Sequence, residues 1–203
     1  MDIDLRQLAV LIILSLAILL RLVSHRHAGG MTRDQSDGVE LEGGTAAAII
    51  ARLVFLVGGL GLLITWLVAP DVLPGTVDLP GWAHWLGLVL AEVGLVLLMA
   101  VQVALGVHFS GTLHLRDDHR LVRTGPYAAI RHPMYTSFLL LFAGLSLMVA
   151  NVPLAVILLG SQVWVIGWRL PKEEQQLADR FGTDWSDYRA TTRALVPPFR
   201  FGR

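Results

Sequence analysis

Apolar side chains gather in five long runs along the chain, separated by shorter polar stretches. The runs cover residues 5–23, 46–69, 82–107, 136–150 and 154–168. Because an α-helix needs about 20 apolar residues to cross a bilayer, runs of this kind are typical of transmembrane helices. A signal peptide is the competing interpretation of the first run, but the acidic start, Asp2 and Asp4, and the Arg21 near its end favour a retained span. The pattern predicts an all-α integral membrane protein with about five transmembrane helices.

The last two apolar runs are joined by a very short connection. Only Asn151-Val152-Pro153 separates them, and so short a joint is typical of a tight helical hairpin. Each run is barely long enough to span a bilayer, so the start of the first run and the end of the second, the two feet of the hairpin, are expected at one membrane face. Arg131 and His132, before the first run, then come close to Arg169 and Glu173, after the second. We therefore expect a polar site where the two feet meet.

Beyond the last apolar run, residues 171–193 have an amphipathic pattern. Leu177 and Phe181 are four positions apart and form one apolar edge among polar neighbours. Gly182 predicts a helix stop, and residues 184–188 begin a second short helix. We expect these C-terminal cytoplasmic helices to cover a cofactor pocket, although a surface helix that only covers the bundle would show the same pattern.

Basic residues are concentrated on one side of the predicted spans. With five spans, residues 21–45, residues 108–134 and the C-terminal tail share a side, and they hold 14 of the 16 basic residues. The positive-inside rule therefore predicts that the C-terminus and the site are cytoplasmic and that the N-terminus is outside. We divide the chain into an N-terminal part with three spans, residues 1–107, and a half that carries the candidate site, residues 108–203.

Composition narrows the classes of protein that fit this pattern. Hydrophobic residues make up 54% of the 203 residues and charged residues 16%, which is too apolar for an ordinary soluble domain. The formal net charge is zero, so nucleic acid is not an expected partner. The chain has no cysteine and no HExxH, Walker A or GxGxxG pattern, so we predict no metal site and no nucleotide-binding domain. Abundant Arg, Gly and Ala suggest a bacterial chain, and hence the bacterial inner membrane.

A polar segment punctuated by Gly and Pro, residues 119–135, carries most of the candidate chemistry. Arg131 suits a carboxylate ligand because its guanidinium can donate two parallel hydrogen bonds. The adjacent Glu173 and Glu174 suit an amine or ribose hydroxyls, since neighbouring carboxylates repel each other unless a cation lies beside them. Tyr127 adds an aromatic face that suits a cation such as a sulfonium.

Two polar residues interrupt the third apolar run. Glu92 lies well inside it, where an ionised acid costs roughly 3 kcal/mol unless it is paired or protonated. A protonated or interhelical hydrogen-bonded side chain explains Glu92 at least as well as a ligand contact does. Gln102 lies near the inner end of the run, and we expect it to reach the polar segment.

Two spaced motifs in the second half of the chain resemble those of the isoprenylcysteine carboxyl methyltransferase family. The first is His119-x-Leu121-Val122-x-x-Gly125-Pro126-Tyr127-x-x-x-Arg131-His132-Pro133-x-Tyr135. The second is Glu173-Glu174-x-x-Leu177-x-x-x-Phe181-Gly182, followed by Tyr188, Pro197 and Pro198. The resemblance covers residues 102–199, and it departs from the family at Trp185, where the family usually has tyrosine.

The resemblance implies a membrane methyltransferase that uses S-adenosylmethionine and releases S-adenosylhomocysteine. Its lipophilic acceptor is expected to enter from the bilayer and to be methylated at a carboxylate. The resemblance places Arg131 and Glu173, as catalytic residues, nearest the transferring methyl or the substrate head group. It also implies seven cofactor contacts: Gln102, His119, Leu121, Val122, Tyr127, His132 and Glu174.

Other functions stay open on this sequence. Phospholipid amine N-methyltransferases share this kind of C-terminal half, and a non-catalytic membrane protein that kept the fold would share it too. Sterol reductases have related motifs, but this chain has too few spans for that class. The glycines of the second run, Gly58, Gly59 and Gly61, permit a dimer without requiring one.

Overall fold

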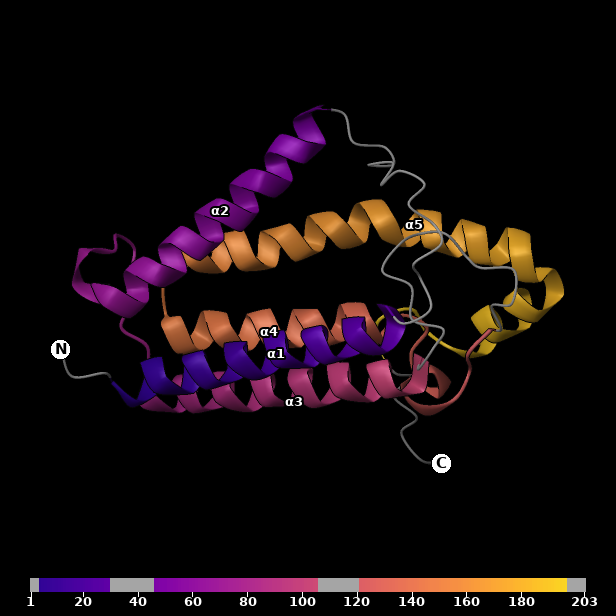
Figure 1. Cartoon of the computed structure of the whole chain (residues 1–203), viewed down its shortest axis with the longest axis horizontal. Coiled ribbons are helices and arrows are strands. Elements are labelled where there is room, and N and C mark those ends of the chain that lie inside the picture. The colour runs from indigo at the N-terminus through magenta and orange to yellow at the C-terminus, as the bar shows by residue number, and fades with distance from the viewer. Residues whose placement is uncertain (1–3, 30–45, 106–120, 197–203) are drawn as a thin grey trace.

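The computed structural model describes residues 4–29, 46–105 and 121–196, and these form a bundle of helices (Figure 1). The long helices are α1 (Leu5–Gly29), α2 (Ala46–Val68), α3 (Gly81–Leu105), α4 (Pro133–Val149) and α5 (Val152–Thr191). Two short 3-10 helices, η1 (Pro70–Val72) and η3 (Gly125–Ala128), lie in the connections. Within the described ranges the β-structure consists of isolated bridges, so the predicted all-α class is confirmed.

Two of the helices, α3 and α5, are long and apolar enough to cross a membrane by length and composition. The stretches Leu5–Leu20, Val57–Val68 and Pro133–Val149 are shorter apolar helices by the same criterion, which covers only the described residues. The five apolar runs thus all correspond to helices, while the number of membrane spans stays a prediction.

Helices α3 and α4 make a close contact that depends on glycine. A Cβ atom added at Gly144 would lie 2.4 Å from both the nitrogen of Ala91 and the carbonyl oxygen of Gly87. A Cβ atom at Gly94 would lie 2.6 Å from the nitrogen of Leu141. Such distances leave room only for hydrogen, so small residues let the two backbones touch, as in membrane helix pairs.

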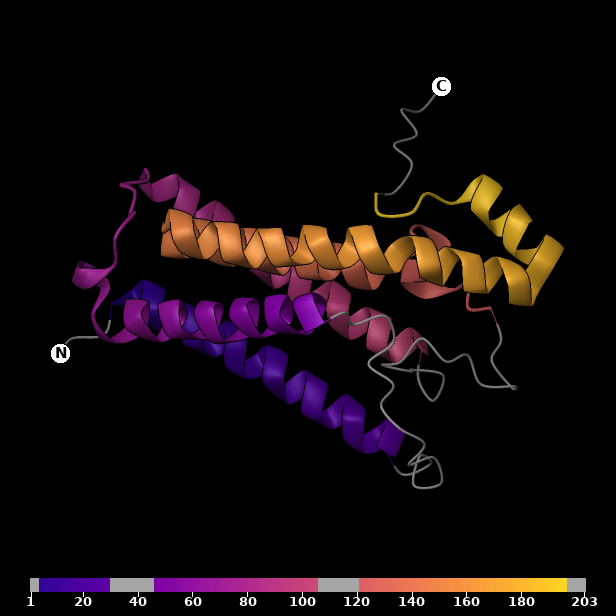
Figure 2. The same ribbon diagram turned by 90° about the horizontal axis from the view of Figure 1, so that it is seen from above.

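The glycines of α2 make a looser contact than those of α3 and α4. A Cβ atom at Gly59 would lie 3.1 Å from a methyl group of Ile157 on α5, and one at Gly58 would lie 3.8 Å from the same side chain. Gly61 faces open space within the described part of the chain. Figure 1 shows α2 meeting the beginning of α5 and diverging from it toward its own N-terminal end, and Figure 2 shows α1 splaying away from the bundle toward its C-terminal end.

The joint between α4 and α5 has the geometry of a tight hairpin. Ala150 has a positive φ of 51°, and the side chain of Asn151 accepts a hydrogen bond from the nitrogen of Leu154, which caps α5. The amide of Asn151 also donates to the carbonyl of Pro74, and the nitrogen of Val152 donates to the carbonyl of Gly75. The connection before α3 therefore fixes the tip of the hairpin, far from its two feet.

Past its apolar part, α5 continues as a polar helix and then turns sharply. Gly182 has φ 50° and ψ −118°, a conformation that favours glycine, and the chain resumes as a short helix that ends at Thr191. Figure 2 shows this last helix folded back toward the feet of the hairpin. The predicted helix stop at Gly182 and the second short helix are confirmed.

Candidate functional site

The site lies where the segment before α4 meets the C-terminal end of the chain. The nitrogens of Arg131 and His132 donate to the carbonyls of Arg193 and Ala194, each at 2.9 Å. The hydroxyl of Thr136 donates to the carbonyl of Leu195 at 2.6 Å. These hydrogen bonds hold the C-terminal segment against the start of α4 and include a short parallel β-bridge between Ile130 and Arg193. Two distant parts of the sequence therefore lie side by side at the site.

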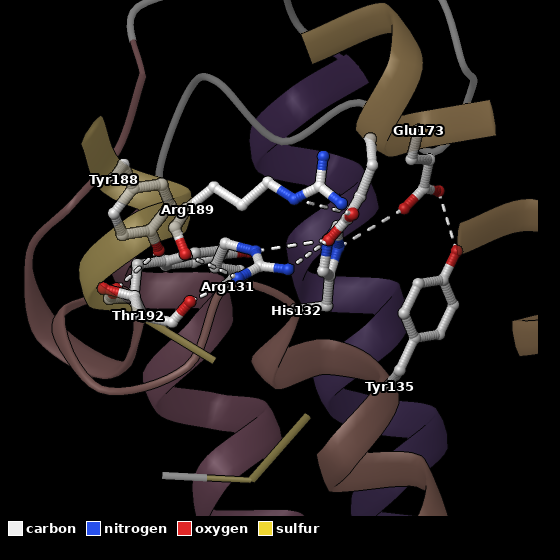
Figure 3. A network of polar contacts seen from close by, with 9 residues as sticks. Arg131, His132, Tyr135, Glu173, Tyr188, Arg189 and Thr192 are labelled. Atoms are coloured by element: carbon white, nitrogen blue, oxygen red, sulfur yellow. Dashed lines mark hydrogen bonds and ion pairs between the residues drawn. The ribbon is translucent and has the colours of Figure 1, made fainter. Parts of the chain in front are cut away.

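Arg131 is the centre of the polar network drawn in Figure 3. Its Nη2 donates to Oε1 of Glu174 at 2.6 Å, and its Nε donates to the same oxygen at 3.2 Å. Its Nη1 donates to the carbonyls of Arg189 and Thr192. The guanidinium lies 5.8 Å from the centre of the Trp185 ring, and only 9% of the side chain is exposed. Arg131 therefore joins the polar part of α5 to the helix beyond Gly182.

Glu174 is held as a carboxylate by the cations around it. Burial alone would raise its pKa, but hydrogen bonding and charge interaction with Arg131 lower the pKa of Glu174 below its usual value. Nε of Arg189 lies 3.8 Å from its second oxygen. Glu174 is thus an anion with its charge already balanced.

Glu173 has a different environment from its neighbour. The hydroxyl of Tyr135 donates to Oε1 of Glu173 at 2.7 Å, and Nη2 of Arg169 lies 3.4 Å from the same oxygen. Burial raises the pKa of Glu173, and the Tyr135 hydrogen bond and the Arg169 charge offset this only in part. The two adjacent glutamates therefore differ in proton affinity: the pKa of Glu173 is raised and that of Glu174 is lowered.

His132 lies between the two glutamates. Its Nδ1 is 3.7 Å from Oε2 of Glu173 and its Nε2 is 3.4 Å from Oε1 of Glu174. Burial lowers the pKa of His132 to about 4 despite the attraction of Glu174, so the ring is neutral near pH 7. These contacts are therefore polar rather than ionic. Nε2 is buried and makes no hydrogen bond to any described residue.

Aromatic rings from the last helix line the other side of the network. Trp185 is 2% exposed and meets the ring of His132 edge-on at 6.5 Å. Tyr188 meets Trp185 at 5.7 Å and donates its hydroxyl to the carbonyl of Tyr127 at 2.6 Å. Nε1 of Trp185 is buried without a hydrogen-bond partner among the described residues. The site thus combines aromatic faces with buried, unused ring nitrogens.

The structure brings together the central residues named from the sequence. Arg131, His132, Glu173 and Glu174 form one connected cluster, and Tyr127 joins it through Tyr188. The network also includes Tyr135, Trp185 and Tyr188, which were outside the predicted set, and Arg169, which the sequence placed at the site without assigning it a role. Tyr135 had a usable signal, since it is three positions after His132 and so shares a helix face with it.

The remaining predicted residues lie at the edge of this cluster or outside the described ranges. Leu121 and Val122 are partly buried in the segment before η3, and they take no part in its described hydrogen bonds and ion pairs. Gln102 is partly buried in the last turn of α3, next to the end of the helix that approaches Gly125. Glu92 is exposed on α3. His119 lies outside the described residues.

Comparison with known proteins gives consistent matches. Residues 85–179 match the family model of the isoprenylcysteine carboxyl methyltransferase (ICMT) family. A probable protein-S-isoprenylcysteine O-methyltransferase of rice (Oryza sativa subsp. indica) is 30% identical over 119 residues, which are 57% of this chain and 62% of the relative. Protein-S-isoprenylcysteine O-methyltransferase B of Arabidopsis thaliana is 28% identical over 167 residues, 78% of this chain and 83% of the relative.

The fold has a counterpart among solved structures. The eukaryotic intramembrane Ras methyltransferase ICMT superposes with a TM-score of 0.58 at 19% sequence identity, covering 92% of this chain and 66% of that one. This chain therefore spans less than two thirds of the rice relative and of the solved structure. The family model, the relatives and the shared fold agree, and the chain is similar to the isoprenylcysteine carboxyl methyltransferase family in sequence and in fold.

Proposed function

We propose that the protein is an S-adenosylmethionine-dependent membrane methyltransferase that acts on the carboxylate of a lipophilic acceptor. The observation that carries the proposal is the polar cluster of Arg131, His132, Glu173 and Glu174, which sits at the feet of an apolar helical hairpin. A cluster at such a boundary can meet a polar cofactor from water and an apolar acceptor from lipid. The relatives' names support a carboxyl methyltransferase.

The donor set of the cluster fits S-adenosylmethionine. Trp185 and Tyr188 place aromatic rings beside the cluster, and the buried nitrogens of His132 and Trp185 lack hydrogen-bond partners among the described residues. When bound, the cofactor supplies an activated methyl group whose sulfur leaves with the bonding electron pair. We propose that its contacts come from the predicted set: Gln102, His119, Leu121, Val122, Tyr127, His132 and Glu174.

The protein's part in the reaction is to bind, orient and exclude water. An acceptor carboxylate has a pKa near 4 and is ionised at neutral pH, so one of its oxygens can attack the methyl carbon without a base. Holding the two reactants in line can supply roughly 7–11 kcal/mol in ideal intramolecular cases. Arg131 and Glu173 are the residues proposed nearest the transferring methyl or the head group.

The proposal includes the setting of the site. We propose five transmembrane helices, three of them in residues 1–107, with residues 108–203 carrying the site. The C-terminus and the site would face the cytoplasm and the N-terminus the outside of a bacterial inner membrane. The 14 of 16 basic residues on one side support this orientation. The acceptor and membrane lipids are the expected partners, and an oligomer is permitted but not required.

Titration calorimetry in detergent tests the proposal directly. S-adenosylhomocysteine should bind the purified protein, and Arg131→Ala should abolish or strongly weaken that binding. Arg180→Ala, an exposed change on the same helix α5, should bind like the wild type. Absence of binding in the wild type would favour the alternative of a non-catalytic membrane protein.

The nature of the methylated group needs a second assay. Labelled methyl groups transferred into a membrane extract should be released as volatile methanol by mild base, because methyl esters hydrolyse. Label that stays in the lipid fraction after base treatment would instead identify a phospholipid amine N-methyltransferase.

A further inference from the structure

Arg131 and Arg169 differ in how far their hydrogen-bond donors are already used. Arg131 donates twice to Glu174 and also to two backbone carbonyls, those of Arg189 and Thr192. Four of its five N–H donors therefore already have an acceptor among the described residues. A carboxylate that took two hydrogen bonds from Arg131 would have to displace Glu174 or release the C-terminal segment.

Arg169 is much less engaged. Its contact with Glu173 is 3.4 Å, whereas the ion pair of Arg131 with Glu174 is 2.6 Å. Charge-assisted N–H···O bonds are usually about 2.7–2.9 Å, so the Arg169 contact is a loose one. Nε of Arg169 is buried and makes no hydrogen bond to the described part of the chain. A buried guanidinium nitrogen without an acceptor is costly, and it marks a place where an acceptor atom is missing.

The position of Arg169 on α5 adds a second argument. The apolar run of α5 ends at Trp168, so Arg169 is the first charged residue after the apolar part of the helix. Its side chain is 30% exposed. A lipophilic molecule whose tail lies along the apolar part of α5 would present its polar head at this level. Arg169 lies four residues before Glu173, and therefore on the same helix face as the cluster.

The charge on Glu173 also bears on the availability of Arg169. Burial raises the pKa of Glu173, and Tyr135 already donates a hydrogen bond to the oxygen that faces Arg169. Glu173 is thus a poorer counter-ion than Glu174, and the Arg169 cation keeps attraction for a further anion.

We propose that Arg169, rather than Arg131, is the residue that binds the carboxylate of the lipophilic acceptor. This inference rests on the proposed methyltransferase function and names the acceptor-binding group within the same site. Arg131 is then a positioning residue, which holds Glu174 and the last helix in place. A cation at the head-group position favours an anionic acceptor and disfavours the ammonium of a phospholipid amine.

Binding of matched probes in the absence of turnover tests this inference. The probes are N-acetyl-S-farnesylcysteine and its carboxamide, which share a lipophilic tail and differ in one charge. Binding of each is measured in detergent with S-adenosylhomocysteine at saturation. The wild type should prefer the carboxylate, and Arg169→Gln should lose that preference by roughly 10- to 100-fold, as expected for a lost charge-assisted hydrogen bond. Binding of the carboxamide should change little.

Two further variants separate acceptor binding from general damage. Arg169→Lys should recover part of the carboxylate preference, because it keeps the charge and loses the planar fork. Arg180→Gln, on the exposed side of the same helix, should keep the wild-type preference. In methyl-transfer assays, Arg169→Gln should raise KM for the carboxylate more than it lowers kcat.

The possible outcomes distinguish this inference from the function on which it rests. If S-adenosylhomocysteine binds but Arg169→Gln still prefers the carboxylate, Arg169 is not the acceptor-binding residue and the inference is wrong. A wild type that binds both probes equally would also overturn it. A protein that does not bind S-adenosylhomocysteine at all would overturn the proposed methyltransferase function, and the inference with it.

Discussion

Arg131 and Glu174 are 43 positions apart in the sequence, yet Nη2 of Arg131 lies 2.6 Å from Oε1 of Glu174. Both side chains are largely buried, 9% and 16% exposed. The hairpin of α4 and α5 makes this contact, because it leaves the site on α4 and returns to it on α5. The pair connects the start of one helix to the polar end of the other.

Removing Arg131 should destabilise the protein strongly. Arg131→Ala leaves Glu174 without its main partner in a poorly hydrated place, and breaking such a pair costs roughly 3 kcal/mol. Thermal unfolding in detergent measures the change, with the exposed Arg180→Ala as a control expected within about 0.5 kcal/mol of wild type. The double variant that also carries Glu174→Gln should lose less free energy of unfolding than the two single variants lose together. Strict additivity would show that the pair does not couple.

The Tyr188 hydroxyl should stabilise the contact between the last helix and η3. Tyr188→Phe removes a 2.6 Å hydrogen bond and leaves the carbonyl of Tyr127 unsatisfied, at a cost of about 1–2 kcal/mol. We also expect weaker binding of S-adenosylhomocysteine, since Tyr127 is a proposed cofactor contact. Thr191→Ala, an exposed change on the same helix, should leave both quantities close to wild type. Equal behaviour of the two variants would argue against a role for the hydroxyl.

His132 should make the fold less stable in acid. Burial lowers its pKa to about 4 in the folded protein, from 6.5 in the unfolded chain. Between these values the unfolded chain binds a proton that the folded protein does not, so this contribution is full above pH 6.5 and is lost as the pH falls toward 4. From about pH 7.5 to about pH 5 the loss amounts to roughly 2 kcal/mol.

Denaturant titrations at the two pH values, with His132→Gln beside the wild type, measure this effect. The variant should lose less stability on acidification than the wild type does. His84→Gln, which alters a histidine that contacts the carbonyl of Leu147 away from the site, should retain the wild-type dependence. Parallel curves for the wild type and His132→Gln would contradict the prediction.

Gly144 and Gly160 should respond oppositely to the same substitution. Gly144→Ala places a methyl group 2.4 Å from backbone atoms of α3, and such overpacking costs about 1–3 kcal/mol or more. Gly160→Ala on α5 meets nothing within 4 Å in the described part of the chain and should gain about 0.5–1 kcal/mol from helix propensity. Thermal unfolding of the two variants compares them directly, and a stable Gly144→Ala would show that the helices can separate.

Much of the fold could be predicted from the sequence, because helices and short connections follow from local patterns of apolar and polar residues. Five apolar runs predicted the helices, and the three-residue joint at 151–153 predicted the hairpin, since so short a connection forces its neighbours to be antiparallel. The hairpin in turn predicted that Arg131 and His132 would meet Glu173. The helix stop at Gly182 followed from the conformational freedom of glycine.

The tertiary structure decided how the site residues divide their roles. Glu173 and Glu174 are adjacent and chemically identical, so only the family resemblance gave them different roles at the level of sequence. The fold gives Glu173 a hydrogen bond from Tyr135 and Glu174 hydrogen bonds from Arg131. The sequence pointed to Arg131 as the carboxylate-binding cation and gave Arg169 no role. In the folded chain, the guanidinium of Arg131 donates to Glu174, whereas Nε of Arg169 is buried without an acceptor among the described residues. Contacts of this kind join distant segments, so they depend on how whole helices pack rather than on the local sequence pattern.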